Sequence, residues 1–238
     1  MAEISSFIVT VDGPAGVGKS TLAKSLAEKF RLAYLDTGAM FRALAMHLGD
    51  GSWNWSCQRL QDALSDVDFR LTDQGAETTL TLNSTPIGPE IRREEIGLWA
   101  SRLGQRPEIR TCLKIAQQQI GYRTSLVAEG RDMGTVVFPG AQCKIFLDAT
   151  AQERARRRCL QLDQQGHHQD EDKVTKDLLE RDRQDRNRKQ APLRPAEDAY
   201  VLDTTDLNQD QVMQWLFVQV QKACSLKGDP RPKSEMSL

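Results

Sequence analysis

Short apolar runs recur along the chain, separated by segments in which apolar residues have helical spacing. The runs have the length of buried strands and lack an alternating polar face, which is typical of strands covered on both sides of a parallel sheet. They lie at residues 7–11, 32–35, 126–128, 143–147 and 199–202. Between them apolar residues recur every three or four positions, as Leu22, Leu26 and Phe30 do. Strands that alternate with helices predict an α/β fold, with helices on both faces of a doubly wound parallel sheet of five strands.

Acidic residues stand where these predicted strands end. Four of the runs end in or lead into Asp12, Asp36, Glu129 and Asp148, and Asp203 follows the fifth. In doubly wound sheets ligands bind outside the carboxyl ends of the strands. The sequence therefore places a polar site at that edge of the sheet.

Residues 66–87 interrupt the rhythm of strand and helix. Apolar residues there alternate with polar ones on both sides of the turn signal Asp73-Gln74-Gly75, which predicts an antiparallel hairpin or three-stranded sheet. Residues 88–122 return to helical periodicity. We interpret residues 64–104 as a small inserted subdomain within a single domain of residues 1–225.

Two later segments differ in composition from the rest. Residues 150–190 carry many charges of both signs, which predicts two solvated helices laced by salt bridges. Residues 226–238 contain Gly228, Pro230 and Pro232 and few large apolar side chains, which predicts a disordered tail.

Composition describes a soluble globular protein of 238 residues, with 39% apolar residues, 27% charged residues and a net charge of −1. The charge balance argues against nucleic acid as a partner, and no apolar run is long enough to cross a membrane. The five cysteines are scattered and do not combine with the histidines at the spacing of a metal site. We expect the two adjacent histidines at 167–168 to lie in a flexible loop. We expect a cytoplasmic monomer with reduced thiols.

A phosphate-binding pattern follows the first predicted strand. The letters GPAGVGKS fit G-x-x-x-x-G-K-[ST], in which glycines turn backbone N–H groups inward and the next helix adds the field of its N-terminus. The lysine brings charge to the β- and γ-phosphates, and the hydroxyl of Ser20 can bind Mg²⁺. The pattern predicts a nucleotide site of the P-loop NTPase type, formed by Gly13, Pro14, Ala15, Gly16, Val17, Gly18, Lys19, Ser20 and Thr21.

A phosphate loop alone does not define a reaction, because GTPases, ATPases and kinases share it. The sequence has no N-K-x-D motif to read guanine, and D-x-x-G occurs only at Asp163–Gly166, away from any predicted strand end. No predicted strand ends in the Asp-Glu pair of many mechanical ATPases. A GTPase and a mechanical ATPase are therefore both disfavoured.

Arginines gather in the segments that follow the predicted strands. Guanidinium groups match phosphate oxygens bidentately and keep their charge, and one phosphate group would not need so many of them. Two polyanionic substrates would need them, because their mutual repulsion must be offset before a phosphoryl group can move. The residues concerned are Arg42, Arg131, Arg154, Arg157, Arg158, Arg181, Arg186 and Arg188.

No clear general base accompanies these arginines, although Asp36 or Asp132 could serve as one. An acceptor phosphate is already ionised and needs no base, so this pattern favours a nucleoside monophosphate kinase over a kinase of small alcohols. A small-metabolite kinase of the same fold, such as a shikimate-type kinase, stays the alternative enzyme. A nucleotide-binding switch without an acceptor is the alternative from another class.

Several motifs resemble one family closely. Gly13–Thr21 and Leu35–Arg42 resemble nucleoside monophosphate kinases in general, with Thr37 where serine is common. The segment EGRDMGTVVFP at 129–139 is more specific and resembles the signature of bacterial-type cytidylate kinases, and the resemblance runs from about residue 7 to about residue 222. It implies transfer of the γ-phosphoryl group of ATP to CMP or dCMP with Mg²⁺. It also implies that the insert helps to bind CMP and that residues 150–170 form a lid.

The resemblance also implies a role for particular residues. Lys19, Arg131 and Arg188 would be catalytic, and Arg157 would bind ATP from a lid that also carries Arg154 and Arg158. Asp132 would accept a hydrogen bond from the exocyclic amine of cytosine, while Ser101 and Arg110 donate to the other polar atoms of the base. The acceptor nucleotide would bind to Thr37, Arg42, Ser101, Arg110, Arg131, Asp132, Arg181, Asp185 and Arg188.

Overall fold

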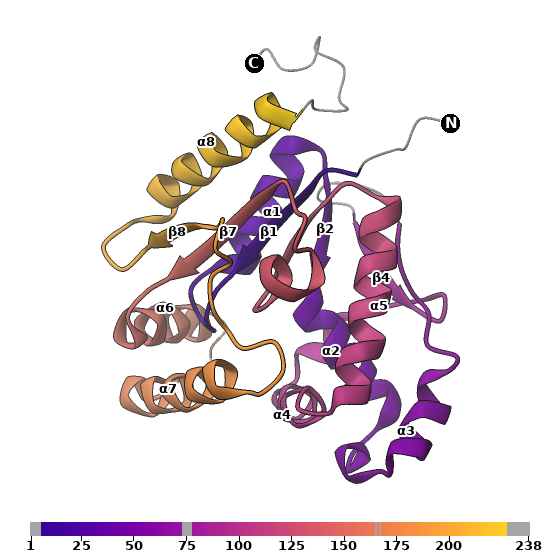
Figure 1. Cartoon of the computed structure of the whole chain (residues 1–238). Coiled ribbons are helices and arrows are strands. Elements are labelled where there is room, and N and C mark those ends of the chain that lie inside the picture. Colours follow the sequence, from indigo (N-terminus) through magenta and orange to yellow (C-terminus); the bar gives the residue numbers. More distant parts are fainter. Residues whose placement is uncertain (1–5, 73–77, 165, 167, 228–238) are drawn as a thin grey trace, which may run out of the picture.

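The computed structural model describes residues 6–72, 78–164, 166 and 168–227, and its centre is a five-stranded parallel sheet (Figure 1). The strand order is β2-β6-β1-β7-β8, and every neighbouring pair is parallel. The five strands predicted from apolar runs are confirmed, each within two residues of its expected ends. They are β1 (Ile8–Asp12), β2 (Ala33–Asp36), β6 (Leu126–Gly130), β7 (Cys143–Asp148) and β8 (Tyr200–Asp203).

Helices cover both faces of this sheet, as an all-parallel sheet requires. One face packs against α1 (Lys19–Phe30) and α8 (Gln209–Lys227) through a core that includes Leu26 and Leu216. The other face packs against α2 (Thr37–Leu48) and α5 (Pro107–Arg123). The periodicity of α1 explains its position, because Leu22, Leu26 and Phe30 lie on the buried side.

The segment between α2 and α5 contains the predicted antiparallel sheet. Its strands make an antiparallel sheet of order β3-β4-β5, in which Phe69 pairs with Leu82 across the first two strands. Phe69, Leu82 and Ile96 join the same apolar core as α2 and α5, so the insert packs onto the main domain. Its elements are η1 (Ser52–Asn54), α3 (Cys57–Leu64), β3 (Phe69–Thr72), β4 (Thr79–Leu82), β5 (Thr85–Pro86), η3 (Pro89–Arg92) and α4 (Glu94–Leu103).

Two charged helices, α6 (Ala151–Gln164) and α7 (Glu171–Asn187), pack against each other beyond the carboxyl end of β7 (Figure 1). This confirms the prediction of two helices in residues 150–190. The π-helix η4 (Met133–Val137) follows β6. The last helix runs to Lys227, and the remaining part of the predicted tail, residues 228–238, lies outside the described residues.

Candidate active site

The acidic strand ends lie side by side at the carboxyl edge of the sheet. Asp36 at the end of β2 is in register with Glu129 of β6, and Asp12 of β1 is in register with Gly130. Asp148 and Asp203 pair in the same way at the ends of β7 and β8. The expected polar edge is therefore present, and the phosphate loop begins directly after Asp12.

The phosphate loop has the backbone that its glycines allow. Gly13 has φ of +151°, and a Cβ there would lie 2.1 Å from the carbonyl oxygen of Leu147, so no other residue fits this position. The loop leads into α1, whose first residue is Lys19. Gly18 precedes it without a side chain to cap the first-turn N–H groups, which leaves these donors for an anion.

Lys19 lies within the loop. Its side chain is buried, and Nζ donates a hydrogen bond to the carbonyl oxygen of Pro14 at 2.7 Å. Burial lowers the pKa of Lys19 well below its usual value, and the positive charge of Arg131 lowers it further. The carboxylates of Glu129 and Asp12 oppose this fall, and a cation in this position is suited to the phosphates of a nucleotide.

Glu129 joins two hydroxyl groups beside the loop. Ser20 Oγ donates to Glu129 Oε2 at 2.9 Å, and the hydroxyl of Tyr34 donates to Glu129 Oε1. Burial raises the pKa of Glu129, and the nearby charge of Asp36 raises it further. The sequence placed Glu129 at a strand end but gave it no role, and it gave no signal for Tyr34.

These oxygen atoms fit a magnesium ion. Ser20 and Glu129 have the hard oxygen atoms that Mg²⁺ prefers, whereas the oxygens of Asp36 accept from Arg92 and from the N–H of Ala39. Mg²⁺ is held in kinases by one or two protein groups together with phosphates and water. No group of three or more histidine, cysteine or carboxylate side chains suited to a metal occurs in the described part of the chain. The protein's share of the site would thus be small, with phosphate oxygens completing it.

Five of the predicted acceptor residues meet in one ion-pair network. Arg131 Nε donates to Asp185 Oδ2 at 3.0 Å, and Arg110 Nη2 donates to Asp132 Oδ2 at 2.5 Å. Arg188 links the two pairs, because its guanidinium lies 3.5 Å from Asp132 Oδ1 and 3.5 Å from Asp185 Oδ1. The network brings together residues of α5, the end of β6 and α7, all at the carboxyl edge of the sheet.

The remaining predicted acceptor residues are not members of this ion-pair network. Thr37 Oγ1 donates to the carbonyl oxygen of Glu129 at 2.7 Å, and Arg42 Nη1 donates to that of Ile91 at 3.2 Å. Desolvation in the cleft and the charge of Arg131 lower the pKa of Arg181 to about 10. Ser101 lies exposed on α4.

Asp12 connects the phosphate loop to the acceptor network. Its carboxylate accepts hydrogen bonds from the backbone N–H groups of Met133 at 2.9 Å and Gly134 at 2.7 Å. Burial raises the pKa of Asp12 to about 6, although these two N–H groups oppose the rise. Met133 directly follows Asp132, which belongs to the ion-pair network. Asp12, the residue before the phosphate loop, therefore also fixes the backbone next to that network.

A pocket of about 310 Å³ adjoins the network. Arg110 and Asp132 line it together with Phe41, whose ring offers a flat apolar surface. Gln117 of α5 also lines it and is buried, and its Nε2 atom has no partner in the part of the chain that is described. The pocket is wide enough for a nucleobase and is lined by polar groups that could orient one.

The three predicted lid arginines have three different environments. Arg158 is exposed and donates to Gln161, whereas Arg157 donates to Glu153 and to the carbonyl oxygen of Thr204 at 2.5 Å. Arg154 is buried, and its guanidinium donates hydrogen bonds to backbone and side-chain oxygens of the protein. Burial therefore distinguishes Arg154 from the other two, and which of the three arginines contacts a ligand stays a prediction.

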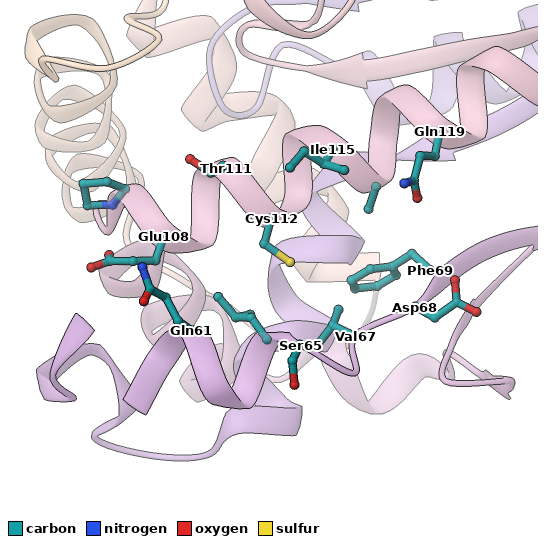
Figure 2. Close-up of a pocket in the computed structure, with 13 residues that line it drawn as sticks. Gln61, Ser65, Val67, Asp68, Phe69, Glu108, Thr111, Cys112, Ile115 and Gln119 are labelled. Atoms are coloured by element: carbon teal, nitrogen blue, oxygen red, sulfur yellow. The ribbon is translucent and has the colours of Figure 1, made fainter. Parts of the chain in front are cut away.

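A second pocket of about 550 Å³ lies between α3, β3 and α5 (Figure 2). Figure 2 shows Cys112 and Phe69 directed into it from α5 and β3. It shares Thr111 with the first pocket but holds none of the phosphate-loop or network residues. It is therefore distinct from the phosphate loop and the ion-pair network, and the sequence did not predict it.

The parallel sheet, the lysine-bearing phosphate loop and the nearby arginines are the features of a P-loop phosphotransferase. The model of the cytidylate kinase family matches residues 9–222. A cytidylate kinase from Maridesulfovibrio salexigens is 53% identical over 216 residues, which cover 91% of this chain and 97% of the relative. Another from Oleidesulfovibrio alaskensis is 52% identical over 201 residues, which cover 84% of this chain and 92% of that relative. The chain belongs to the cytidylate kinase family.

Family membership confirms the prediction of an enzyme that transfers the γ-phosphoryl group of ATP to CMP or dCMP with Mg²⁺, and it decides against the switch and the small-metabolite kinase. Among solved structures, a shikimate kinase from Bacteroides thetaiotaomicron is 13% identical, with a TM-score of 0.45 over 92% of this chain and 99% of that one. So distant a likeness carries no argument about the substrate.

Proposed function

We propose that this chain phosphorylates CMP and dCMP at one edge of its sheet, with ATP on the loop 13–20 and the acceptor over the network of α5, β6 and α7. The observation that carries the proposal is the chain of contacts Arg110–Asp132–Arg188–Asp185–Arg131. Three cations and two carboxylates in one cleft suit a ligand that has both an anionic phosphate and a polar base.

The donor side of the site rests on the loop and Lys19. The N–H groups of the loop and of the first turn of α1 bind the phosphates of ATP, and Lys19 leaves the carbonyl of Pro14 to reach them. Ser20 and Glu129 would hold the Mg²⁺ that accompanies the nucleotide, and this ion would neutralise phosphate charge.

Transfer needs charge neutralisation more than a base. Arg131 and Arg188 exchange their carboxylate partners for the oxygens of the acceptor phosphate, so that two anionic phosphates can approach in line. Because the attacking oxygen is already ionised, no side chain has to accept a proton.

The base of the acceptor is read by Asp132 and Arg110. A carboxylate accepts from the exocyclic amine of cytosine, and Arg110 with Ser101 donates to the ring nitrogen and the carbonyl. UMP would oppose a carbonyl to the Asp132 carboxylate, which is 8% exposed, and two facing acceptors in a buried site are costly. The insert, residues 64–104, completes this side of the site because α4 carries Ser101.

The lid consists of residues 150–170. Arg157 reaches the loop that follows β8, and Arg158 is exposed on α6. Closure of this segment over ATP excludes water as a competing acceptor. Arg157 contacts the nucleotide in the closed state.

The chain acts as a cytoplasmic monomer without a nucleic acid partner. None of the five cysteines, all of which lie in the described part of the chain, forms a disulfide, which suits a reducing compartment. No helix among the described residues has the length and apolar character to cross a bilayer.

Asp185, together with Arg181, binds the ribose hydroxyls of the acceptor, so a change at Asp185 separates CMP from dCMP. We expect Asp185→Ala to reduce kcat/KM for both CMP and dCMP, because Arg131 loses its partner, and to reduce that for CMP about tenfold more. The additional loss reflects the 2′-hydroxyl, which dCMP lacks. Asp177→Ala, an exposed change on the same helix, is the matched control. Equal losses with the two acceptors would remove Asp185 from ribose recognition.

The reaction itself is tested by following both products. The purified chain with ATP, Mg²⁺ and CMP should form CDP and ADP in equal amounts, resolved by anion-exchange chromatography, and chelation of Mg²⁺ should stop both. ADP formed without CDP would mean hydrolysis and would contradict the proposal.

A further inference from the structure

Arg154 is a buried cation where three segments meet. Its side chain is 4% exposed, and the guanidinium donates from Nε to Ala149 O at 3.0 Å, from Nη1 to Ala15 O at 2.9 Å and from Nη2 to Asp182 Oδ2 at 2.5 Å. A guanidinium is planar and its donors form a fixed fork. One side chain therefore holds the start of α6, the phosphate loop and α7 in a fixed relation.

The phosphate loop also packs directly on these helices. Gly16 has φ of +79°, and a Cβ there would lie 3.3 Å from both Cβ and the carbonyl oxygen of Arg154. Ala15 belongs to a small apolar cluster with side chains of α6 and α7, among them Ala155 and Leu178. The shape of the loop at residues 15 and 16 therefore depends on α6 and α7 as well as on its glycines.

The bond from Arg154 sets the direction of a peptide group in the loop. In a trans peptide the C=O and the N–H point in opposite directions. Because Arg154 holds the carbonyl of Ala15 toward α6, the N–H of Gly16 in the same peptide unit points away from α6. Loop N–H groups bind phosphates only when they face the concavity. We infer that Arg154 is a positioning residue, which orients the Ala15–Gly16 peptide for the phosphates of ATP.

Asp182 extends this role to the acceptor side. It lies on α7 between Arg181 and Asp185, and its Oδ1 atom is buried without a hydrogen-bond partner among the described residues. Arg154 thus holds the carboxylate through Oδ2 and, with the same guanidinium, holds the loop. The inference rests on the proposed function, in which α7 carries acceptor residues and the loop carries ATP.

The test compares variants that keep or lose the three hydrogen bonds of the Arg154 guanidinium. Arg154→Lys retains a positive charge beside Asp182, but an ammonium group cannot make the three hydrogen bonds of the planar guanidinium. We therefore expect about a tenfold rise in the Kd of ATP and in the KM for ATP. The Kd is measured by calorimetry without the acceptor. Arg154→Met should give a larger rise. The KM for CMP should change less than about twofold in the lysine variant. Arg156→Lys, an exposed change on the same helix, should match the parent chain.

The outcomes separate positioning from stability. A lysine variant with a lowered Tm and an unchanged Kd for ATP would mean that Arg154 only stabilises the fold, and this result overturns the inference. If Arg154→Met does not fold, the lysine variant decides alone. Asp182→Asn keeps an oxygen for Nη2, so its affinity for ATP should stay within about twofold of the parent, and a larger loss would assign the effect to Asp182 instead. Failure of the parent chain to phosphorylate CMP would contradict the proposed function without affecting the binding test.

Discussion

Replacing Lys19 with alanine should lower kcat about a thousandfold, by a similar factor for CMP and dCMP. Lys19 is the buried cation of the phosphate loop, and its charge acts on the transferred group rather than on the acceptor. The effect should therefore be common to both acceptors. A steady-state assay of ADP formation with each acceptor measures it.

The same change should leave the fold intact. Burial and the charge of Arg131 disfavour the charge of Lys19, whereas Glu129 and Asp12 favour it, so removing the charge removes opposing interactions together. Lys19→Met keeps the apolar stem and should be about as stable to urea as the parent chain while it loses the same activity. Lys29→Ala, an exposed change on α1, controls for general effects on the helix. Unchanged turnover in Lys19→Met would exclude the loop lysine from the mechanism.

Replacing Asp132 with asparagine should lower kcat/KM for CMP about a hundredfold or more and lower that for UMP much less. Asp132 holds Arg110 at 2.5 Å and lies 3.5 Å from Arg188, so its two oxygens orient both arginines. An asparagine keeps the shape but presents an N–H₂ group, which can donate to the carbonyl of uracil. The preference for CMP over UMP should fall to within about tenfold.

The measurement is kcat/KM for CMP and UMP with the parent and variant chains. Asp177→Asn, a change at an exposed position on α7, provides a carboxylate-to-amide control away from the base pocket. An equal loss for CMP and UMP would show that Asp132 organises the arginines without reading the base.

Local signals allowed much of the fold and of the candidate site to be predicted. The apolar runs and the glycine pattern of residues 13–20 each depend on residues close in sequence, and the structure has strands and a loop at these places. The edge site followed from topology, because parallel strands bring their carboxyl ends together. Asp12, Asp36 and Glu129 therefore lie where the sequence indicates, although their hydrogen-bond partners were not foreseen.

The missing parts depend on contacts between distant segments. Tyr34 meets Glu129 across 95 positions, and Arg92 pairs with Asp36 at 2.6 Å across 56 positions. Neither pair has a sequence motif. Charge density in α6 predicted a solvated surface, yet Arg154 on that helix is buried, because a paired and hydrogen-bonded charge can be accommodated inside a protein. Composition cannot distinguish such an arginine from its exposed neighbours Arg156 and Arg158.

The central claim is that the acceptor site selects cytosine. The most direct test gives the parent chain ATP, Mg²⁺ and an equal mixture of CMP and UMP, and measures the initial ratio of CDP to UDP by chromatography. This ratio equals the ratio of the two kcat/KM values. The account predicts at least about a hundredfold excess of CDP, because uracil opposes an acceptor to the carboxylate of Asp132. Equal amounts of the two products, or an excess of UDP, would contradict it.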